Sequence, residues 1–159
     1  MSKKKFQDSG ETIYSFLDDL LVTCSQCKNC AKIVRVDVSD RTWFAPRRLV
    51  CNKCGLIGNW AKKSMCVGGV APVDPFFGLP LFFSANCCGH TLWAYNLKHI
   101  NLIEDYVSAE LREHTQNQET GWMNKGLVNR LPQWMINAKN RDNVLKVIAK
   151  LKKDLLTSA

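Results

Sequence analysis

Apolar and polar residues alternate in the first half of the chain with the period of a β-strand. In residues 31–38, the valines at every second position fall on one face, and a mixed set of Ile, Arg and Asp falls on the other. After a turn, residues 48–50 return as a second apolar stretch, and residues 56–61 add a third strand. The pattern predicts a small antiparallel sheet.

Two further strands are predicted after a stretch that is rich in Gly and Pro. Residues 68–80 carry Gly or Pro at six positions, which indicates a loop. Residues 81–85 and 91–95 are apolar and flank a turn at residues 86–90, which predicts a β-hairpin. Because its strands are so apolar, we expect this hairpin to extend the first sheet and to be covered by helices.

Helices are predicted where apolar residues recur every three or four positions. Residues 11–21 have this period and precede the first predicted strand. Asn96 can cap a second helix over residues 97–113. A third helix is expected to begin, or to be interrupted, near Pro132, and a last helix spans about residues 140–156 with lysines on its polar side.

Cysteine spacing adds a specific chemistry to this pattern. Two separate C-x2-C units begin at Cys24 and at Cys51, and an apolar stretch runs into each of them. Two thiolates separated by two residues bind a metal ion from a tight turn, and two such turns supply the soft ligands of a tetrahedral zinc site. Packing alone rarely produces this spacing, so buried free thiols or disulfides are the weaker interpretation. We predict a zinc ribbon with one structural Zn²⁺ held by Cys24, Cys27, Cys51 and Cys54.

An alternative ligand set exists because Cys27 also forms an overlapping C-x2-C unit with Cys30. The pair Cys27 and Cys30 leaves 20 residues before Cys51, whereas the pair that starts at Cys24 leaves 23. The shorter gap matches the usual spacing better. However, an apolar stretch enters both Cys24 and Cys51, while a polar residue precedes Cys27. We therefore favour Cys24 and keep Cys30 as the alternative.

Together these elements predict an α+β fold. An N-terminal zinc ribbon contributes an antiparallel sheet, a β-hairpin extends the sheet, and C-terminal α-helices pack against it. Residues 1–66 are expected to form a short helix and the ribbon, residues 67–114 the hairpin and helix of the same core, and residues 115–159 a basic helical segment. With 159 residues, 46% of them hydrophobic, the chain is long enough for a packed core.

Positive charge is concentrated in two parts of the chain, whose net charge is +8. Residues 24–66 hold nine basic and two acidic side chains, and residues 122–159 hold eight and two. Two basic zones are typical of proteins that contact phosphate backbones, although mild basicity also aids solubility. No apolar run reaches the ~18 residues of a transmembrane helix, and the N-terminus lacks an apolar signal core. We expect a cytoplasmic protein with no membrane partner and with reduced thiols on metal.

The tip of the first predicted hairpin interleaves aromatic residues with arginines. Residues 41–48 read Arg-Thr-Trp-Phe-Ala-Pro-Arg-Arg. Aromatic rings stack on unpaired bases and arginines clamp phosphates, although large aromatic residues more often pack inside a fold. The candidate nucleic-acid contacts are Arg35, Arg41, Trp43, Phe44, Arg47, Arg48, Lys53, Lys62 and Lys63.

A second group of thiols surrounds the turn of the second predicted hairpin. Cys66, Cys87, Cys88 and His90 carry the atoms for another metal site, but adjacent cysteines in an extended segment point to opposite faces. Cys88 and His90 could also act as a nucleophilic pair, which would require a lowered thiol pKa and a cleft. The simpler expectation is a buried cysteine and a hydrogen-bonded turn histidine, with no catalytic residue.

Two segments carry a family resemblance together with the cysteine pairs. Residues 87–96 read Cys-Cys-Gly-His-Thr-Leu-Trp-Ala-Tyr-Asn, and residues 130–142 read Arg-Leu-Pro-Gln-Trp-Met-Ile-Asn-Ala-Lys-Asn-Arg-Asp. Over most of its length the chain resembles a functionally uncharacterised family of small bacterial zinc-ribbon proteins of the transcription-factor type. The resemblance implies a metal site at the matching cysteines and leaves the partner open.

Two main hypotheses for function follow from these patterns. The leading one is a structural-zinc protein that binds DNA or RNA through its basic surfaces. The alternative is an adapter that docks on a protein assembly, such as one of transcription or translation. A closed four-cysteine site leaves no open coordination position for catalysis, so an enzyme that uses Cys88 and His90 is the minor alternative.

Overall fold

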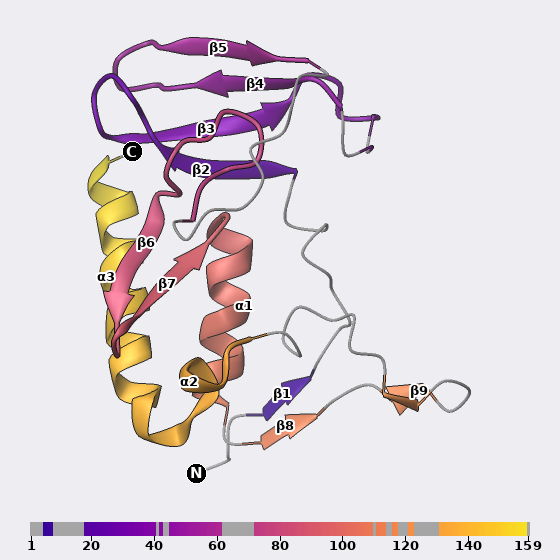
Figure 1. Ribbon diagram of the computed structural model, residues 1–159, viewed down its shortest axis with the longest axis vertical. Coiled ribbons are helices and arrows are strands. Elements are labelled where there is room, and N and C mark those ends of the chain that lie inside the picture. Colours follow the sequence, from indigo (N-terminus) through magenta and orange to yellow (C-terminus); the bar gives the residue numbers. More distant parts are fainter. Residues whose placement is uncertain are drawn as a thin grey trace.

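The computed structural model describes residues 5–7, 18–40, 42, 45–61, 72–109, 111–113, 116–117, 121–122 and 131–158. Within these residues the protein is an α+β fold with antiparallel sheets and a long C-terminal helix, as predicted (Figure 1). None of the described helices combines the length and the apolar character needed to cross a lipid bilayer.

The largest sheet consists of four consecutive antiparallel strands at one end of the molecule. These are β2 (Asp19–Thr23), β3 (Cys30–Arg35), β4 (Arg47–Val50) and β5 (Ile57–Trp60), in that spatial order. Successive side chains of a strand point to opposite faces, so one face of the sheet collects the apolar positions. This inner face packs against residues 76 and 81 in a core that includes Leu20, Val22, Ala31, Ile33, Leu49, Trp60, Phe76 and Leu81.

The start of this sheet differs from the prediction for residues 11–21. Residues 19–21 lie in β2 and not in a helix, because Leu20 pairs with Ile33 and Leu21 pairs with Lys32. Leu20 faces the inner core of the sheet, and Leu21 faces a second core on the opposite side. Burial on both sides favours a strand over a helix with one apolar stripe. Residues 11–17 lie outside the described part of the chain.

Strand β3 is shorter than predicted, and the face that it buries is opposite to the face that carries the valines. It ends at Arg35, and its buried residues are Ala31 and Ile33. Val36 and Val38 lie beyond the strand and are 51% and 84% exposed. The alternating valines therefore do not mark the core face, since the pattern continues past the last residue that pairs with a neighbouring strand.

The second hairpin forms a sheet of its own. Strands β6 (Phe83–Cys87) and β7 (His90–Ala94) pair only with each other in regular ladders among the described residues, so the predicted continuous extension of the first sheet is wrong. The hairpin meets β2 through an isolated bridge between Val22 and Leu81 and a 2.8 Å hydrogen bond from the Leu21 amide to the Tyr95 carbonyl. Its apolar strands are covered by helices, as expected (Figure 1).

The helices pack against this hairpin. They are α1 (Leu97–Ser108), α2 (Gln133–Ile136), the short 3₁₀ helix η3 (Ala138–Asn140) and α3 (Arg141–Ser158). The α2 helix begins directly after Pro132, where the sequence predicts a start. The second core combines helix residues with hairpin residues, and it includes Phe83, Leu92, Ile100, Ile103, Val107, Val144, Ile148 and Leu151.

Helix α1 ends earlier than the predicted residue 113. Residues 111–113 form β8 (Leu111–Glu113), which pairs in parallel with β1 (Lys5–Gln7). Two further short strands, β9 (Gln116–Asn117) and β10 (Gly121–Trp122), pair antiparallel with each other. Pairing with a distant N-terminal segment thus replaces the last helical turn that the periodicity predicts.

Asn96 links the helical part to the four-stranded sheet. Its Oδ1 accepts a 2.9 Å hydrogen bond from the His99 amide at the start of α1, and its Nδ2 donates a 2.7 Å hydrogen bond to the Asp19 carbonyl of β2.

Replacing Asn96 by Ala removes both interactions, so we expect a loss of about 2 kcal/mol in the free energy of unfolding, measured by urea denaturation. Asn143→Ala on the exposed side of α3 is the control, with an expected change below about 0.5 kcal/mol. Equal losses for both variants would contradict the cap.

Candidate metal centre

Two cysteine-containing turns lie at the same end of the four-stranded sheet (Figure 1). One connects β2 to β3 and the other connects β4 to β5. Both repeat the same pair of backbone hydrogen bonds. The first cysteine donates its N–H to the carbonyl of the sixth residue, at 2.8 and 2.9 Å, and the fifth residue donates to the carbonyl of the first cysteine, at 3.0 and 2.8 Å. The two turns are therefore structurally equivalent.

The fifth residue of each turn adopts a left-handed backbone conformation. It is Lys28 in the first turn, with φ of 64°, and Gly55 in the second, with φ of 80°. Gly takes this conformation without steric cost, whereas a lysine there is uncommon. The Lys28 ammonium donates a 3.2 Å hydrogen bond to the Ser25 carbonyl across the turn. The equivalence aligns Cys24 with Cys51 as the first cysteine of each turn.

The four sulfurs of Cys24, Cys27, Cys51 and Cys54 lie within 4.8 Å of one another. The Cys27–Cys51 and Cys24–Cys54 sulfur distances are 3.5 and 3.7 Å. A disulfide requires about 2.05 Å, so these thiols are not bonded to each other. A tetrahedral ion with metal–sulfur bonds of about 2.3 Å holds its sulfurs about 3.8 Å apart. The spacing fits such an ion, and the four residues could hold a metal.

Hydrogen bonds from the turn favour ionised thiols. The side chain and backbone of Asn29 lower the pKa of Cys27 to about 6, and the Cys27 amide lowers the pKa of Cys24. For Cys54, the Leu56 amide acts in the same direction, but burial and the neighbouring sulfurs raise the pKa to about 12. Neighbouring thiolates repel each other, so full ionisation of the group requires a cation between them. Asn29 belongs to this site, although the sequence gives no signal for it beyond its place after the turn.

Cys30 lies apart from the group. Its sulfur is 3.8 Å from the Ala31 carbonyl, it packs against the second core, and burial raises its pKa to about 11. Its amide donates a 2.7 Å hydrogen bond to Ser158 at the end of α3. In the described part of the chain, the geometry thus favours Cys24 over the alternative Cys30.

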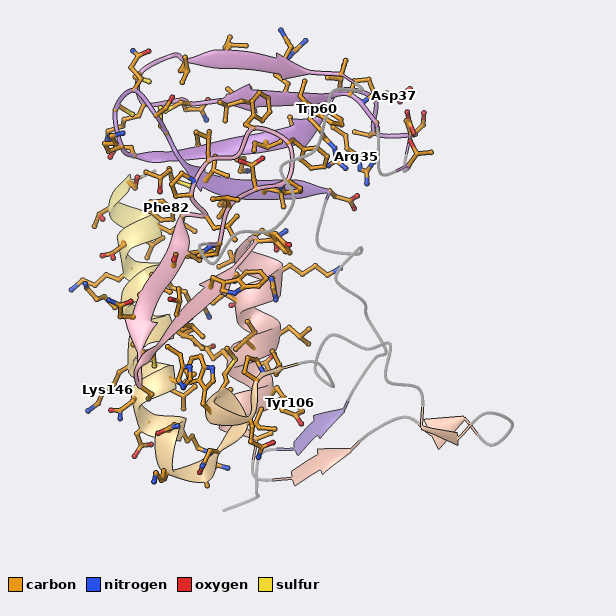
Figure 2. All side chains as sticks on the ribbon, in the orientation of Figure 1. Arg35, Asp37, Trp60, Phe82, Tyr106 and Lys146 are labelled. Carbon is orange, nitrogen blue, oxygen red and sulfur yellow. The ribbon has the colours of Figure 1, made fainter. Side chains whose placement is uncertain are left out.

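The predicted nucleic-acid contacts have different environments. Arg48 and Lys53 are exposed, as a phosphate contact requires. Arg35 is engaged within the protein: its side chain is 8% exposed, and it bonds Asp18 at 2.9 Å and the Asp40 and Thr42 carbonyls at 2.7 and 3.0 Å. Figure 2 places Arg35 near Asp37, at the end of the sheet away from the cysteine turns.

The prediction that Arg47 contacts nucleic acid is wrong. It is fully buried, and its guanidinium carbon lies 4.3 Å from the centre of the Phe76 ring. Arg47 shares the inner face of β4 with Leu49, where the segment around Phe76 covers the sheet, so it cannot reach a phosphate in solvent. Arg41, Trp43, Phe44, Lys62 and Lys63 lie outside the described residues.

Three members of the second predicted thiol group, Cys87, Cys88 and His90, are described, and these three do not form a cluster of metal ligands. Among the described residues, one group of three or more potential metal ligands lies close together, and it consists of the four cysteines of the two turns. His90 instead stacks on Trp134, with ring centres 4.8 Å apart and an angle of 6° between the planes. Cys87 is buried and Cys88 is exposed, and Cys66 lies outside the described residues.

Comparisons of the chain with protein-family models, with curated proteins and with solved structures found no match. The family resemblance therefore stays a prediction, and the site has to be interpreted from its own geometry.

Proposed function

We propose that the protein is a zinc-ribbon protein in which one Zn²⁺, bound by Cys24, Cys27, Cys51 and Cys54, holds the four-stranded sheet for binding to nucleic acid. The observation that carries the metal proposal is the set of four sulfurs, spaced as in a tetrahedral site and presented by two equivalent turns. Thiolate ligands select soft metals such as zinc. Four protein ligands leave no position for a substrate, so the ion is structural.

The proposed contact surface is the outer face of the same sheet, which we call the basic face. Lys32 on β3 and Arg48 on β4 point away from the buried inner face and are exposed. Lys28 and Lys53 add exposed positive charge from the two cysteine turns. The exposed Asp19 is an acidic residue on the same face. Excess positive charge on a surface fixed by the metal suits the phosphates of DNA or RNA.

A hollow at one end of the basic face adds shape to it. Its volume is about 370 Å³, and it lies between β3, β4 and the last turns of α3. Lys32, Lys53 and Asn52 line it together with the apolar side chains of Val50 and Leu155. The two lysines can bind a backbone phosphate, while the apolar side chains of Val50 and Leu155 contact a less polar part of the same nucleotide.

The charge of the basic face is tested by Lys32→Ala, Arg48→Ala and Lys53→Ala in one triple variant. We expect the affinity for a nucleic-acid pool to fall at least about tenfold, and the slope of log K against log salt to decrease by about 3, one for each lost phosphate contact. The control replaces the exposed Lys146, Lys150 and Lys153 of α3, which removes the same charge from another surface; Figure 2 shows Lys146 pointing away from the fold. Equal losses in both triple variants would contradict a specific role for the basic face.

An adapter function is the second candidate, and the edge of the sheet favours it. Among the described residues, β5 pairs with β4 on one side only, and its Ile57 is 63% exposed. An open edge strand can accept an extended segment of another protein by β-strand addition. Binding to cell extract components that does not weaken as salt increases would favour this function over nucleic-acid binding.

A further inference from the structure

The turn of the second hairpin brings two adjacent cysteines together. Cys87 is the last residue of β6 and pairs with His90, and Cys88 and Gly89 form the two-residue turn between them. Cys88 and Gly89 both have positive φ, 52° and 78°. In a regular strand the sulfurs of neighbouring residues lie on opposite faces. Here the left-handed turn places the two sulfurs 3.7 Å apart, which corrects the expectation from the sequence.

The two thiols differ in exposure and in hydrogen bonding. Cys87 is 5% exposed and belongs to the second core, whereas Cys88 is exposed. The Cys87 thiol donates its hydrogen bond to the Cys88 sulfur. Burial raises the pKa of Cys87 to about 11, so Cys87 keeps its proton. The thiolate is the form of a cysteine that reacts with oxidants, so the reacting sulfur must be open to solvent. Cys88 is exposed, so it is the sulfur that an oxidant in the solvent reaches first.

We propose that Cys87 and Cys88 form a redox modification site at which a peroxide converts the pair to a disulfide. The Cys88 thiolate attacks one oxygen of hydrogen peroxide, and the O–O bond breaks to give a Cys88 sulfenic acid and hydroxide. The Cys87 sulfur then attacks the Cys88 sulfur and loses its proton, and the hydroxyl group leaves as water. The two cysteine sulfurs lose two electrons in total, and the peroxide is reduced.

The surroundings of the turn allow this reaction. The sulfurs must approach from 3.7 Å to about 2.05 Å, which requires the turn to adjust. A Cβ added at Gly89 would meet no heavy atom within 4 Å, so this side of the turn is open. Figure 1 shows the hairpin turn at the end of β6 and β7 that lies away from the four-stranded sheet, so the site is separate from the metal centre.

The test treats the zinc-loaded full-length chain with hydrogen peroxide and maps its peptides by mass spectrometry. Trypsin cleaves after Lys63 and Lys98 and leaves Cys66, Cys87 and Cys88 in one peptide, so the first measurement uses Cys66→Ser. We expect the mass of this peptide to fall by two hydrogens, to be restored by dithiothreitol, and zinc to stay bound. Chymotrypsin, which cleaves at the phenylalanines between Cys66 and Cys87, gives the same measurement on the unaltered chain.

Matched variants assign the steps. Cys88→Ser should abolish the mass loss and leave Cys87 unmodified, because the buried thiol is out of reach. Cys87→Ser should stop the reaction at the Cys88 sulfenic acid, which dimedone traps. The proposal is overturned if the pair keeps its hydrogens at peroxide levels that already release zinc. It is also overturned if Cys88 is oxidised or forms a disulfide between two chains without a link to Cys87.

Discussion

Serine in place of Cys27 is expected to abolish zinc binding and to unfold the four-stranded sheet. Cys27 supplies one of the four sulfurs, and its sulfur lies 3.5 Å from that of Cys51 across the site. Zinc binding to structural four-ligand sites contributes about 10–16 kcal/mol, which is as large as the whole stability of a domain of about 5–15 kcal/mol. The zinc content measured by elemental analysis should fall from one ion per chain to none, and the circular dichroism signal of the strands should decrease.

Cys30→Ser is the matched control for this prediction. Cys30 lies three residues away and is also partly buried, but its sulfur lies outside the group. We expect this variant to keep one zinc per chain. If Cys30→Ser loses zinc while Cys24→Ser keeps it, the alternative ligand set is correct; if Cys27→Ser keeps its zinc, neither set is.

The sequence predicts the cluster of Cys24, Cys27, Cys51 and Cys54 well because its signal is local. A C-x2-C unit and the turn around it are specified within a few residues, and the entry of an apolar strand into each turn distinguishes Cys24 from Cys30. The structure adds the backbone hydrogen bonds that make the two turns equivalent. The predicted strands 48–50 and 56–61 agree with β4 and β5 for the same reason, since each adjoins the second cysteine turn.

The predictions that are wrong concern residues whose structure depends on contacts with distant segments of the chain. Residues 19–21 have helical periodicity, but they pair with β3 and are buried on two sides. Arg47 is predicted to be a phosphate contact, and it is buried because residues 72–81 cover its face of β4. A four-residue strand carries too little pattern to show which face a remote loop will cover. The Cys88–Gly89 turn was more accessible to prediction, since Gly favours the positive φ of a two-residue hairpin turn.

The segment that covers the inner face of the sheet depends on one buried carboxylate. Asp74 is fully buried. Its Oδ1 accepts hydrogen bonds from the Phe76 and Phe77 amides at 2.8 and 2.6 Å, and its Oδ2 accepts one from the Leu79 amide at 2.7 Å. These bonds fix the turn that places Phe76 against Trp60, with ring centres 4.9 Å apart, and against Arg47.

Asp74→Ala should therefore destabilise the protein strongly. Three backbone amides lose their acceptor, and at about 1–3 kcal/mol for each unsatisfied buried donor we expect a loss of about 4 kcal/mol by urea denaturation. Asp37→Ala is the control, because Asp37 accepts similar turn hydrogen bonds from Ser39 but is exposed, and its loss should stay below about 1 kcal/mol. Similar losses for the two variants would show that the buried turn is not a main source of stability.

The pH dependence of the Asp74 effect has a definite sign. Burial raises the pKa of Asp74 above its ordinary value of 3.8, although the backbone amides act in the opposite direction. The folded state then binds this proton more tightly than the unfolded state, so the contribution of Asp74 is largest below the unfolded pKa and is lost as pH rises through the folded pKa. The difference in stability between the unaltered chain and Asp74→Ala should increase as the pH falls from neutral towards 3.8, the ordinary pKa of an aspartate. A difference that decreases over this range would mean that the three amides outweigh burial and hold the pKa of Asp74 low.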